Sequence, residues 1–176
     1  SGKVMDRLLI GDVGFGKTEV AMNAIFACIK SGYQCALIVP TTLLSNQHFN
    51  TLCARFANFD TKIAKLDRFS KDRNKILRGL QSGEIDVAIG THGLLSVSFK
   101  NLGLVVLDEE HKFGVKQKEM LKNMTQDVHI LSMSATPIPR TLNLALSKIK
   151  TQSELNTPPI SRVPPKTFVK NYSDLL

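Results

Sequence analysis

Residues 11–18 read GDVGFGKT and fit the pattern G-x-x-x-x-G-K-[ST]. The pattern follows an apolar run, RLLIG at 7–11, and precedes a stretch with helical periodicity. Glycines at 14 and 16 allow backbone conformations that turn successive N–H groups towards phosphate oxygens, where a Cβ would obstruct. A helix that begins near Lys17 adds the positive end of its dipole. The pattern therefore predicts a strand, a phosphate-binding loop and a helix.

The residue types in this loop suit a nucleoside triphosphate. Lys17 is placed to reach the β- and γ-phosphates, and the Thr18 hydroxyl is placed to ligate Mg²⁺. We expect the whole loop to bind the nucleotide, through Gly11, Asp12, Val13, Gly14, Phe15, Gly16, Lys17 and Thr18. The alternative is a glycine-rich turn that only caps a helix.

A second motif, LVVLDEEH at 104–111, supplies the acidic groups that hydrolysis needs. Asp108 is expected at the carboxyl end of a hydrophobic strand, which is the edge where ligands bind in parallel sheets. There it can hold Mg²⁺ together with Thr18, and Glu109 can polarise the attacking water. Lys17, Asp108 and Glu109 are therefore the catalytic candidates. The alternative for the two acids is a solvated turn, and their pairing favours NTP hydrolysis over phosphorylation of a second substrate.

Short apolar runs alternate with helical stretches along the chain. The runs are RLLIG (7–11), CALIVP (35–40), TKIAKL (61–66), DVAIG (86–90), LVVLDE (104–109) and VHILSMS (128–134). Helical faces between them are formed by Val20, Ala24, Ile25 and Cys28, by Leu44, Phe49, Leu52, Cys53 and Phe56, and by Ile76, Leu77 and Leu80. Runs this continuous are typical of strands buried on both faces. The predicted fold class is α/β, with a parallel sheet covered by helices on both sides.

Composition limits the classes that remain. The 176 residues, 43% of them hydrophobic and 22% charged, fit one globular domain and exclude disordered, collagenous and coiled-coil classes. No apolar stretch approaches the ~20 residues that cross a bilayer, and no secretion signal is evident, so we expect a cytoplasmic protein without membrane contact. The net charge of +8 indicates a polyanionic partner without identifying one.

The cysteines and histidines give no metal or disulfide pattern. Cys28, Cys35 and Cys53 are odd in number and lack C-x-x-C spacing, so we interpret them as small buried hydrophobes in a reducing compartment. The histidines outside the acidic motif, His48, His92 and His129, are too scattered along the sequence for a zinc site.

Several further segments resemble the first motor lobe of superfamily 2 helicases and translocases. They are PTTLL (40–44), GTHGLL (90–95), DEEH (108–111) and SATPIPRTL (134–142). TPIPRT together with DEEH-x-FGV is narrower and resembles the group formed by RecG and the transcription-repair coupling factor Mfd. Three details favour the Mfd branch: Phe15 where RecG-like sequences usually carry Ser, Glu110 in place of Gln, and the segments RFANF (55–59) and KTFVKNY (166–172).

The resemblance implies a RecA-like lobe of a double-stranded DNA translocase, spanning residues 1–156, in a protein that displaces stalled RNA polymerase in transcription-coupled DNA repair. ATP and Mg²⁺ are the implied cofactors. Double-stranded DNA is the implied partner, with RNA polymerase and UvrA reached through domains outside this chain. The Pro-rich residues 157–176 then begin the connection to a second RecA-like lobe. The corresponding lobe of a RecG-like branched-DNA helicase and a non-catalytic nucleotide-binding module are the alternatives.

The resemblance also implies how nucleotide and DNA are coupled. In this family the SAT segment ends a strand that lies between the phosphate-loop strand and the acidic-motif strand. Ser134 and Thr136 are then expected beside His111, which links the nucleotide to the DNA-contacting loops. The alternatives are an ordinary strand-to-loop turn for Ser134 and Thr136, and a solvated or core histidine for His111.

The implied DNA contacts are Thr41, Thr42, Thr91 and His92, which match the family's strand-tracking loops, and Arg140 of TPIPRT, which could also face the partner lobe. Hydroxyls and N–H groups suit phosphate contacts. The alternatives are helix capping by Thr41 and Thr42 before a helix at 43–57, and a surface role for Arg140. The stretch 61–80 carries seven Lys or Arg against two Asp, which we interpret as a solvated face, with a peripheral DNA contact as the alternative.

Two parts of a complete motor of this family are not found in the sequence. They are the arginine finger of the second lobe and the adenine-recognising segment upstream of the phosphate loop. An arginine finger is worth ~10³–10⁵ in rate. We therefore expect the chain alone to bind ATP weakly and to hydrolyse it very slowly.

Overall fold

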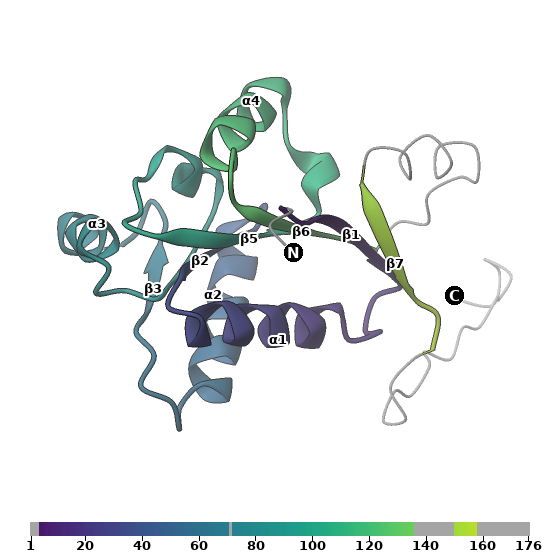
Figure 1. Ribbon diagram of the computed structural model, residues 1–176, viewed down its shortest axis with the longest axis horizontal. Coiled ribbons are helices and arrows are strands. Elements are labelled where there is room, and N and C mark those ends of the chain that lie inside the picture. Colours follow the sequence, from purple (N-terminus) through teal and green to yellow (C-terminus); the bar gives the residue numbers. More distant parts are fainter. Residues whose placement is uncertain (1–3, 71, 136–149, 158–176) are drawn as a thin grey trace, which may run out of the picture.

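Seven parallel strands form one sheet, in the order β3-β4-β2-β5-β6-β1-β7 (Figure 1). The structure, a computed structural model, describes residues 4–70, 72–135 and 150–157. Its strands are β1 (Asp6–Gly11), β2 (Gln34–Ile38), β3 (Ile63–Leu66), β4 (Val87–Gly90), β5 (Leu102–Asp108), β6 (His129–Ser134) and β7 (Thr151–Leu155). The parallel pairing confirms the predicted α/β class.

Helices cover both faces of this sheet. They are α1 (Lys17–Lys30), α2 (Thr42–Arg55), α3 (Arg73–Ser82) and α4 (Val115–Met124), with short 3₁₀ helices at His92–Ser96 and Glu110–Lys112. Buried side chains of α1 and α2 share one apolar cluster with one face of the sheet, and those of α3 and α4 share a second cluster with the other face. The core therefore consists of two layers separated by the sheet.

The central strand β2 shows how the sequence produces these two layers. Successive side chains of a strand point to opposite faces. Cys35 and Leu37 belong to the cluster of α1 and α2, whereas Ala36 and Ile38 belong to the cluster of α3 and α4. All four side chains are buried, as predicted for a continuous apolar run. Strand β3 was predicted to be buried on both faces, but three of its four residues are only partly buried. The reason is that β3 lies at the edge of the sheet.

The buried stripe of α1 differs from the predicted one. Ala21, Met22 and Ile25 are buried, whereas Val20 is 37% exposed. Ala24 and Cys28 pack against the core only in part, together with other partly buried side chains. The prediction for Val20 was wrong because the face of α1 that packs on the sheet is centred on Ala21, Met22 and Ile25.

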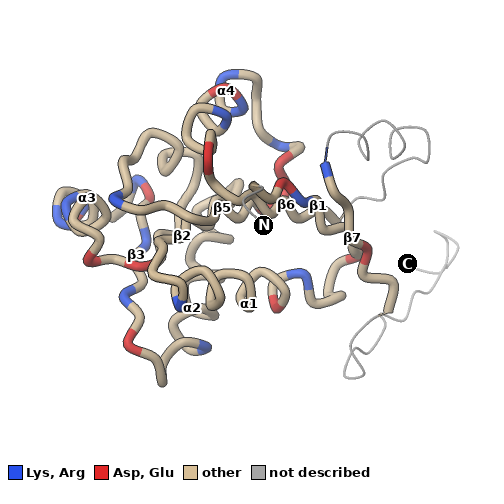
Figure 2. The backbone as a smooth tube through the Cα atoms, in the orientation of Figure 1, with Lys and Arg blue, Asp and Glu red and all other residues tan. Residues whose placement is uncertain are grey.

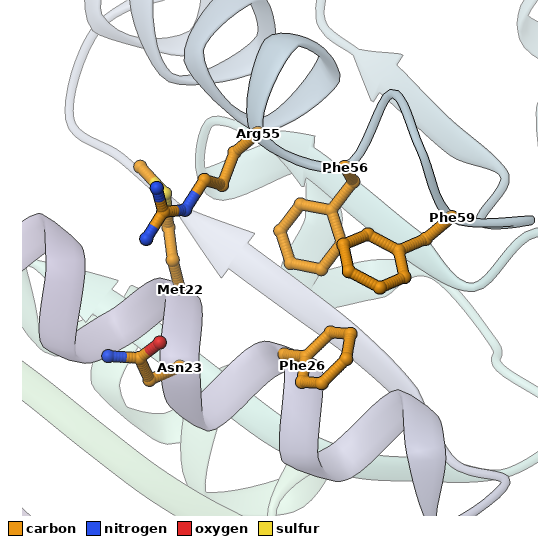
Figure 3. A pocket seen from close by; sticks show the side chains of 6 residues that line it. All are labelled: Met22, Asn23, Phe26, Arg55, Phe56 and Phe59. Atoms are coloured by element: carbon orange, nitrogen blue, oxygen red, sulfur yellow. The ribbon is translucent and has the colours of Figure 1, made fainter.

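Phenylalanines join α1 to the end of α2, as Figure 3 shows. The ring centroid of Phe26 lies 6.0 Å from that of Phe56 and 4.9 Å from that of Phe59. These rings line a hollow of about 300 Å³. Phe26 is nine residues beyond Lys17, or ~14 Å along the helix. The hollow therefore belongs to the packing of the two helices at the end remote from the phosphate loop.

The parallel order gathers the functional segments at one edge. Strands β1, β2, β4, β5 and β6 all end at this edge because they all run in the same direction. Strand β6 lies between β1 and β5, which confirms the position that the family resemblance implies for the strand of the SAT segment. The loops that follow these strands are therefore neighbours in space.

Cys28, Cys35 and Cys53 are all free thiols, and Cys35 is buried. In the described residues, no helix combines the length and apolar character needed to span a bilayer.

Candidate functional site

The phosphate loop connects β1 to α1 and has the backbone that its glycines allow. Gly14 and Gly16 have φ angles of 78° and 85°, in the left-handed region that side chains disfavour. Gly16 is also the residue that caps α1, and it has no side chain that could occupy the helix N-terminus. The N–H groups of Lys17 and Thr18, in the first turn, have no acceptor within the helix. This arrangement suits a bound anion.

Lys17 lies across the loop. Its Nζ donates hydrogen bonds to the carbonyl oxygens of Gly11, at 2.6 Å, and Asp12, at 3.0 Å. The loop itself is closed by the N–H of Phe15, which donates to the Asp12 carbonyl at 3.2 Å. The N–H of Val13 donates to the Asp12 carboxylate at 2.7 Å. The ammonium group is thus held beside the backbone that would surround the phosphates.

Asp108 ends β5 two strands away from the phosphate-loop strand. In the sheet register Asp108 lies opposite Met133 of β6, and Met133 lies opposite Leu9 of β1. Two strand spacings correspond to roughly 10 Å between backbones, a gap that a carboxylate and a hydrated cation can bridge. The Asp108 side chain is 15% exposed, and its Oδ2 lies 3.4 Å from Nε2 of His48 on α2.

Glu109 follows with an unusual backbone. Its φ of 56° is the only positive value outside glycine in the described part of the chain, and such a conformation costs about 1–3 kcal/mol. One carboxylate oxygen accepts a hydrogen bond from the N–H of Ala135 at 3.0 Å, and the other lies 3.1 Å from Nδ1 of His111. The backbone turn thus directs the carboxylate towards the end of β6.

These contacts connect the acidic motif to the SAT segment through Glu109. His111 is about half exposed and contacts Glu109. Ser134 is buried at the end of β6, and the N–H of the next residue, Ala135, links this segment to Glu109. Thr136 lies outside the described residues. The expected placement of Ser134 and Thr136 beside His111 therefore stays a prediction.

Glu110 forms a polar centre that sequence reasoning did not find. Its carboxylate accepts a hydrogen bond from Oγ of Ser132 at 2.6 Å and one from Nζ of Lys150 at 2.9 Å. Burial raises the pKa of Glu110, but the bonds from Ser132 and Lys150 outweigh it and leave the pKa below its ordinary value. The contact between Glu110 and Lys150 connects the acidic motif to the residue just before β7.

Replacing Glu110 by glutamine is expected to lower the free energy of unfolding by about 1.5–3 kcal/mol at pH 7, because hydrogen bonds to charged groups contribute in that range. The lowered pKa means that the ionised form stabilises the fold above the ordinary value near ~4.3, and that this contribution is lost as the pH falls through the folded-state pKa. Denaturant titrations of both proteins between pH 7 and pH 3 measure it. A difference that persists undiminished at pH 3 would contradict the assignment.

The four residues expected to track DNA come together in one groove. Thr41, Thr42, Thr91 and His92 line a groove of about 530 Å³, formed by the loops after β2 and β4. Thr41 is also the N-cap of α2, since its hydroxyl accepts a hydrogen bond from the N–H of Leu44 at 3.2 Å. The helix-cap alternative is therefore correct for Thr41, and the helix begins at Thr42. Arg140 lies outside the described residues.

Known proteins are similar to this chain in sequence. Residues 2–145 match the DEAD/DEAH box helicase family. The transcription-repair-coupling factor of Helicobacter pylori is 63% identical over the whole chain, and that of Escherichia coli is 50% identical over 98% of it. The chain spans only 18% and 15% of the lengths of these two relatives.

Solved structures agree with this result. The structure of RecG bound to a three-way DNA junction matches with a TM-score of 0.80 and 42% identity, over 92% of this chain and 22% of that one. The UvsW helicase of bacteriophage T4 matches with a TM-score of 0.65 at 16% identity, over 85% of this chain and 54% of that one, which shows the fold alone. These similarities confirm the resemblance to the RecG and Mfd group and the RecA-like fold. The chain belongs to the DEAD/DEAH box helicase family.

Proposed function

We propose that this chain is the ATP-binding motor lobe of a transcription-repair coupling factor, an ATP-driven double-stranded DNA translocase that displaces stalled RNA polymerase. The observation that carries the proposal is the sheet register, which brings Asp108 and Glu109 within two strands of the phosphate loop. The 63% identity to the Helicobacter pylori factor supports the choice of relative. RNA polymerase and UvrA would be reached through other domains of such a protein.

The loop residues would bind the triphosphate of ATP. The N–H groups around Gly16 and at the start of α1 would donate to phosphate oxygens, as the positive φ of Gly16 allows. Lys17 would exchange its backbone carbonyl acceptors for the β- and γ-phosphates. Thr18 and Asp108 would hold Mg²⁺, whose bound charge neutralises that of the phosphates. The oxygen donors of a hydroxyl and a carboxylate fit this ion.

Glu109 would orient the attacking water and accept its proton. The carboxylate is held on two sides, by the N–H of Ala135 and by His111, so its direction is fixed before the substrate arrives. Preorganisation of this kind is the principal way in which phosphoryl transfer is catalysed. The same contacts would report the state of the nucleotide to the SAT segment and, through it, to the DNA.

The groove of Thr41, Thr42, Thr91 and His92 would hold a DNA strand by its phosphates, with Arg140 as a further contact. Because phosphates carry no base information, such contacts position the strand without reading its sequence. The N-terminus of α2, which opens into this groove, adds N–H donors and a favourable dipole.

Replacing Thr42 by alanine is expected to weaken DNA binding by about 2- to 10-fold, which corresponds to one hydrogen bond. The loss should be equal for DNA of different sequences. Fluorescence anisotropy with several duplexes measures it, and Thr41→Ser serves as a control that keeps both the hydroxyl and the helix cap. Losses that depend on the base sequence would count against phosphate contacts.

A RecG-like branched-DNA helicase lobe is the second candidate, supported by the TM-score of 0.80 to RecG. The two are separated by assays on the intact protein. A coupling factor releases RNA polymerase from a stalled complex when ATP is added, whereas a RecG-like enzyme unwinds branched DNA. Unwinding of junctions without polymerase release would overturn the proposal. Failure to hydrolyse ATP at all would leave only a nucleotide-binding module.

A further inference from the structure

The loop between β3 and α3 is built around a buried carboxylate. Asp67 is 4% exposed, and its Oδ1 accepts hydrogen bonds from the N–H of Phe69 at 2.8 Å and the hydroxyl of Ser70 at 3.3 Å. Its Oδ2 lies 3.3 Å from Nζ of Lys65. Burial raises the pKa of Asp67, but the hydrogen bond from the N–H of Phe69 and the charge of Lys65 outweigh this effect. The pKa therefore lies below its ordinary value, and the group is ionised at neutral pH. These contacts fix the loop.

This loop presents a charged and an aromatic side chain at the surface. Arg68 lies with its guanidinium carbon 4.7 Å from the ring centroid of Phe69, and Phe69 is 66% exposed. Arg68 and Arg73 line the same groove as Thr41, Thr42, Thr91 and His92. Figure 2 shows that Lys and Arg positions gather on α3.

The close approach of β3 and β4 places the two loops side by side. Leu66 lies opposite Gly90 in the parallel register, so both strands end at the same level. A Cβ on Gly90 would lie 2.2 Å from the carbonyl oxygen of Leu66, so a side chain there would force the strands apart. Glycine at this position therefore keeps the loop of Arg68 beside the loop of Thr91.

Two other cations of the basic stretch, Lys62 and Lys65, are already paired. Nζ of Lys62 lies 3.0 Å from the carboxylate of Glu84, and Lys65 contacts Asp67. Among the described residues, Asp67 is the one acid that lines the groove, and its charge is offset by Lys65. The groove therefore combines two arginines with hydroxyls and helix N–H groups, the donors that bind phosphate oxygens.

We propose that Arg68 and Arg73 bind backbone phosphates of the DNA strand that lies along Thr41 and Thr91, and that Asp67 is the positioning residue that holds Arg68 in this groove. This inference rests on the proposed function, since it assumes that the groove binds DNA. It assigns a role to two positions of the basic stretch and leaves the paired cation Lys62 outside the interface.

The salt dependence of DNA binding by the intact protein tests the arginines. Each phosphate contact that is lost reduces the slope of log K against log salt concentration by about 1. Arg68→Ala and Arg73→Ala are expected to show this reduction, equally for all duplex sequences. Lys62→Ala, which also removes an exposed positive charge near α3, is the matched control and should keep the wild-type slope.

The outcomes separate this inference from the proposed function. Wild-type slopes for both arginine variants, together with weaker binding by Thr42→Ala, would overturn the inference and leave the DNA groove intact. Unchanged DNA binding by Arg68→Ala, Arg73→Ala and Thr42→Ala would overturn both the inference and the proposed DNA groove. A slope that falls equally in Lys62→Ala would also contradict the inference, because a general loss of charge would then explain the effect.

Neutralising Asp67 tests its positioning role. If Asp67 acted only through its charge, Asp67→Asn would strengthen DNA binding by removing a negative group from the groove. Positioning predicts the opposite: Asp67→Asn weakens binding, and adding Arg68→Ala causes little further loss. Thermal unfolding is recorded for each variant, and Ser70→Ala, which removes a milder loop contact, gives a second reading if Asp67→Asn does not fold. Stronger binding by Asp67→Asn, or fully additive losses, would overturn the role.

Discussion

Replacing Lys17 by alanine is expected to abolish ATP-dependent movement along DNA and to lower ATP hydrolysis by at least ~10²–10³-fold. The ammonium of Lys17 lies against the carbonyl oxygens of Gly11 and Asp12, at the mouth of the loop that would surround the phosphates. No other side chain of the loop carries a positive charge. Steady-state ATPase assays and a single-molecule translocation assay on the intact protein measure the two losses.

The control for this variant lies on the same helix. Lys30 is at the far end of α1, where its Nζ lies 5.5 Å from the ring centroid of Phe26. Lys30→Ala should therefore leave hydrolysis and movement unchanged, and thermal unfolding should show that both variants are folded. Translocation at the wild-type rate by Lys17→Ala would remove Lys17 from its proposed role.

Glu109→Gln is expected to lower hydrolysis by ~10²–10⁴-fold while ATP binding is retained. Glutamine keeps an oxygen that can accept the N–H of Ala135, but it cannot accept a proton from water and places no carboxylate beside His111. The variant should therefore bind nucleotide and stop before the chemical step. Rapid-quench measurement of a single turnover, beside a binding titration, separates the two steps.

Glu119→Gln on α4 is the matched control, because it removes an acid from the same half of the chain without touching the acidic motif. It should hydrolyse ATP at the wild-type rate. If Glu109→Gln lost nucleotide binding instead of turnover, Glu109 would serve the shape of the loop through its left-handed backbone and not the chemistry.

The sequence predicted most of the fold because the internal strands are apolar on both faces. Strand β2 is the clearest case, since Cys35, Ala36, Leu37 and Ile38 are all buried. Strand β7 could not be predicted in this way. Its sequence TQSEL is polar, because an edge strand buries little, and only its pairing with β1 makes it part of the sheet.

The candidate site was predicted only where a motif is local in sequence. The phosphate loop and the acidic motif are contiguous, so spacing alone indicates their chemistry. By contrast, His48 reaches Asp108 across 60 residues, and Lys150 reaches Glu110 across 40. The same holds for Arg68, whose place in the groove depends on the register of β3 with β4. Such contacts are set by the order of strands, which no local pattern reveals.

We propose that the phosphate loop binds ATP and that Asp108, together with Thr18, would hold Mg²⁺ beside it. The most direct test of this claim is the affinity for a non-hydrolysable ATP analogue, measured with and without Mg²⁺, in the intact protein and in Asp108→Asn. We expect Mg²⁺ to raise the affinity of the wild-type protein and to have little effect on Asp108→Asn. An equal response to Mg²⁺ in both proteins would contradict the claim.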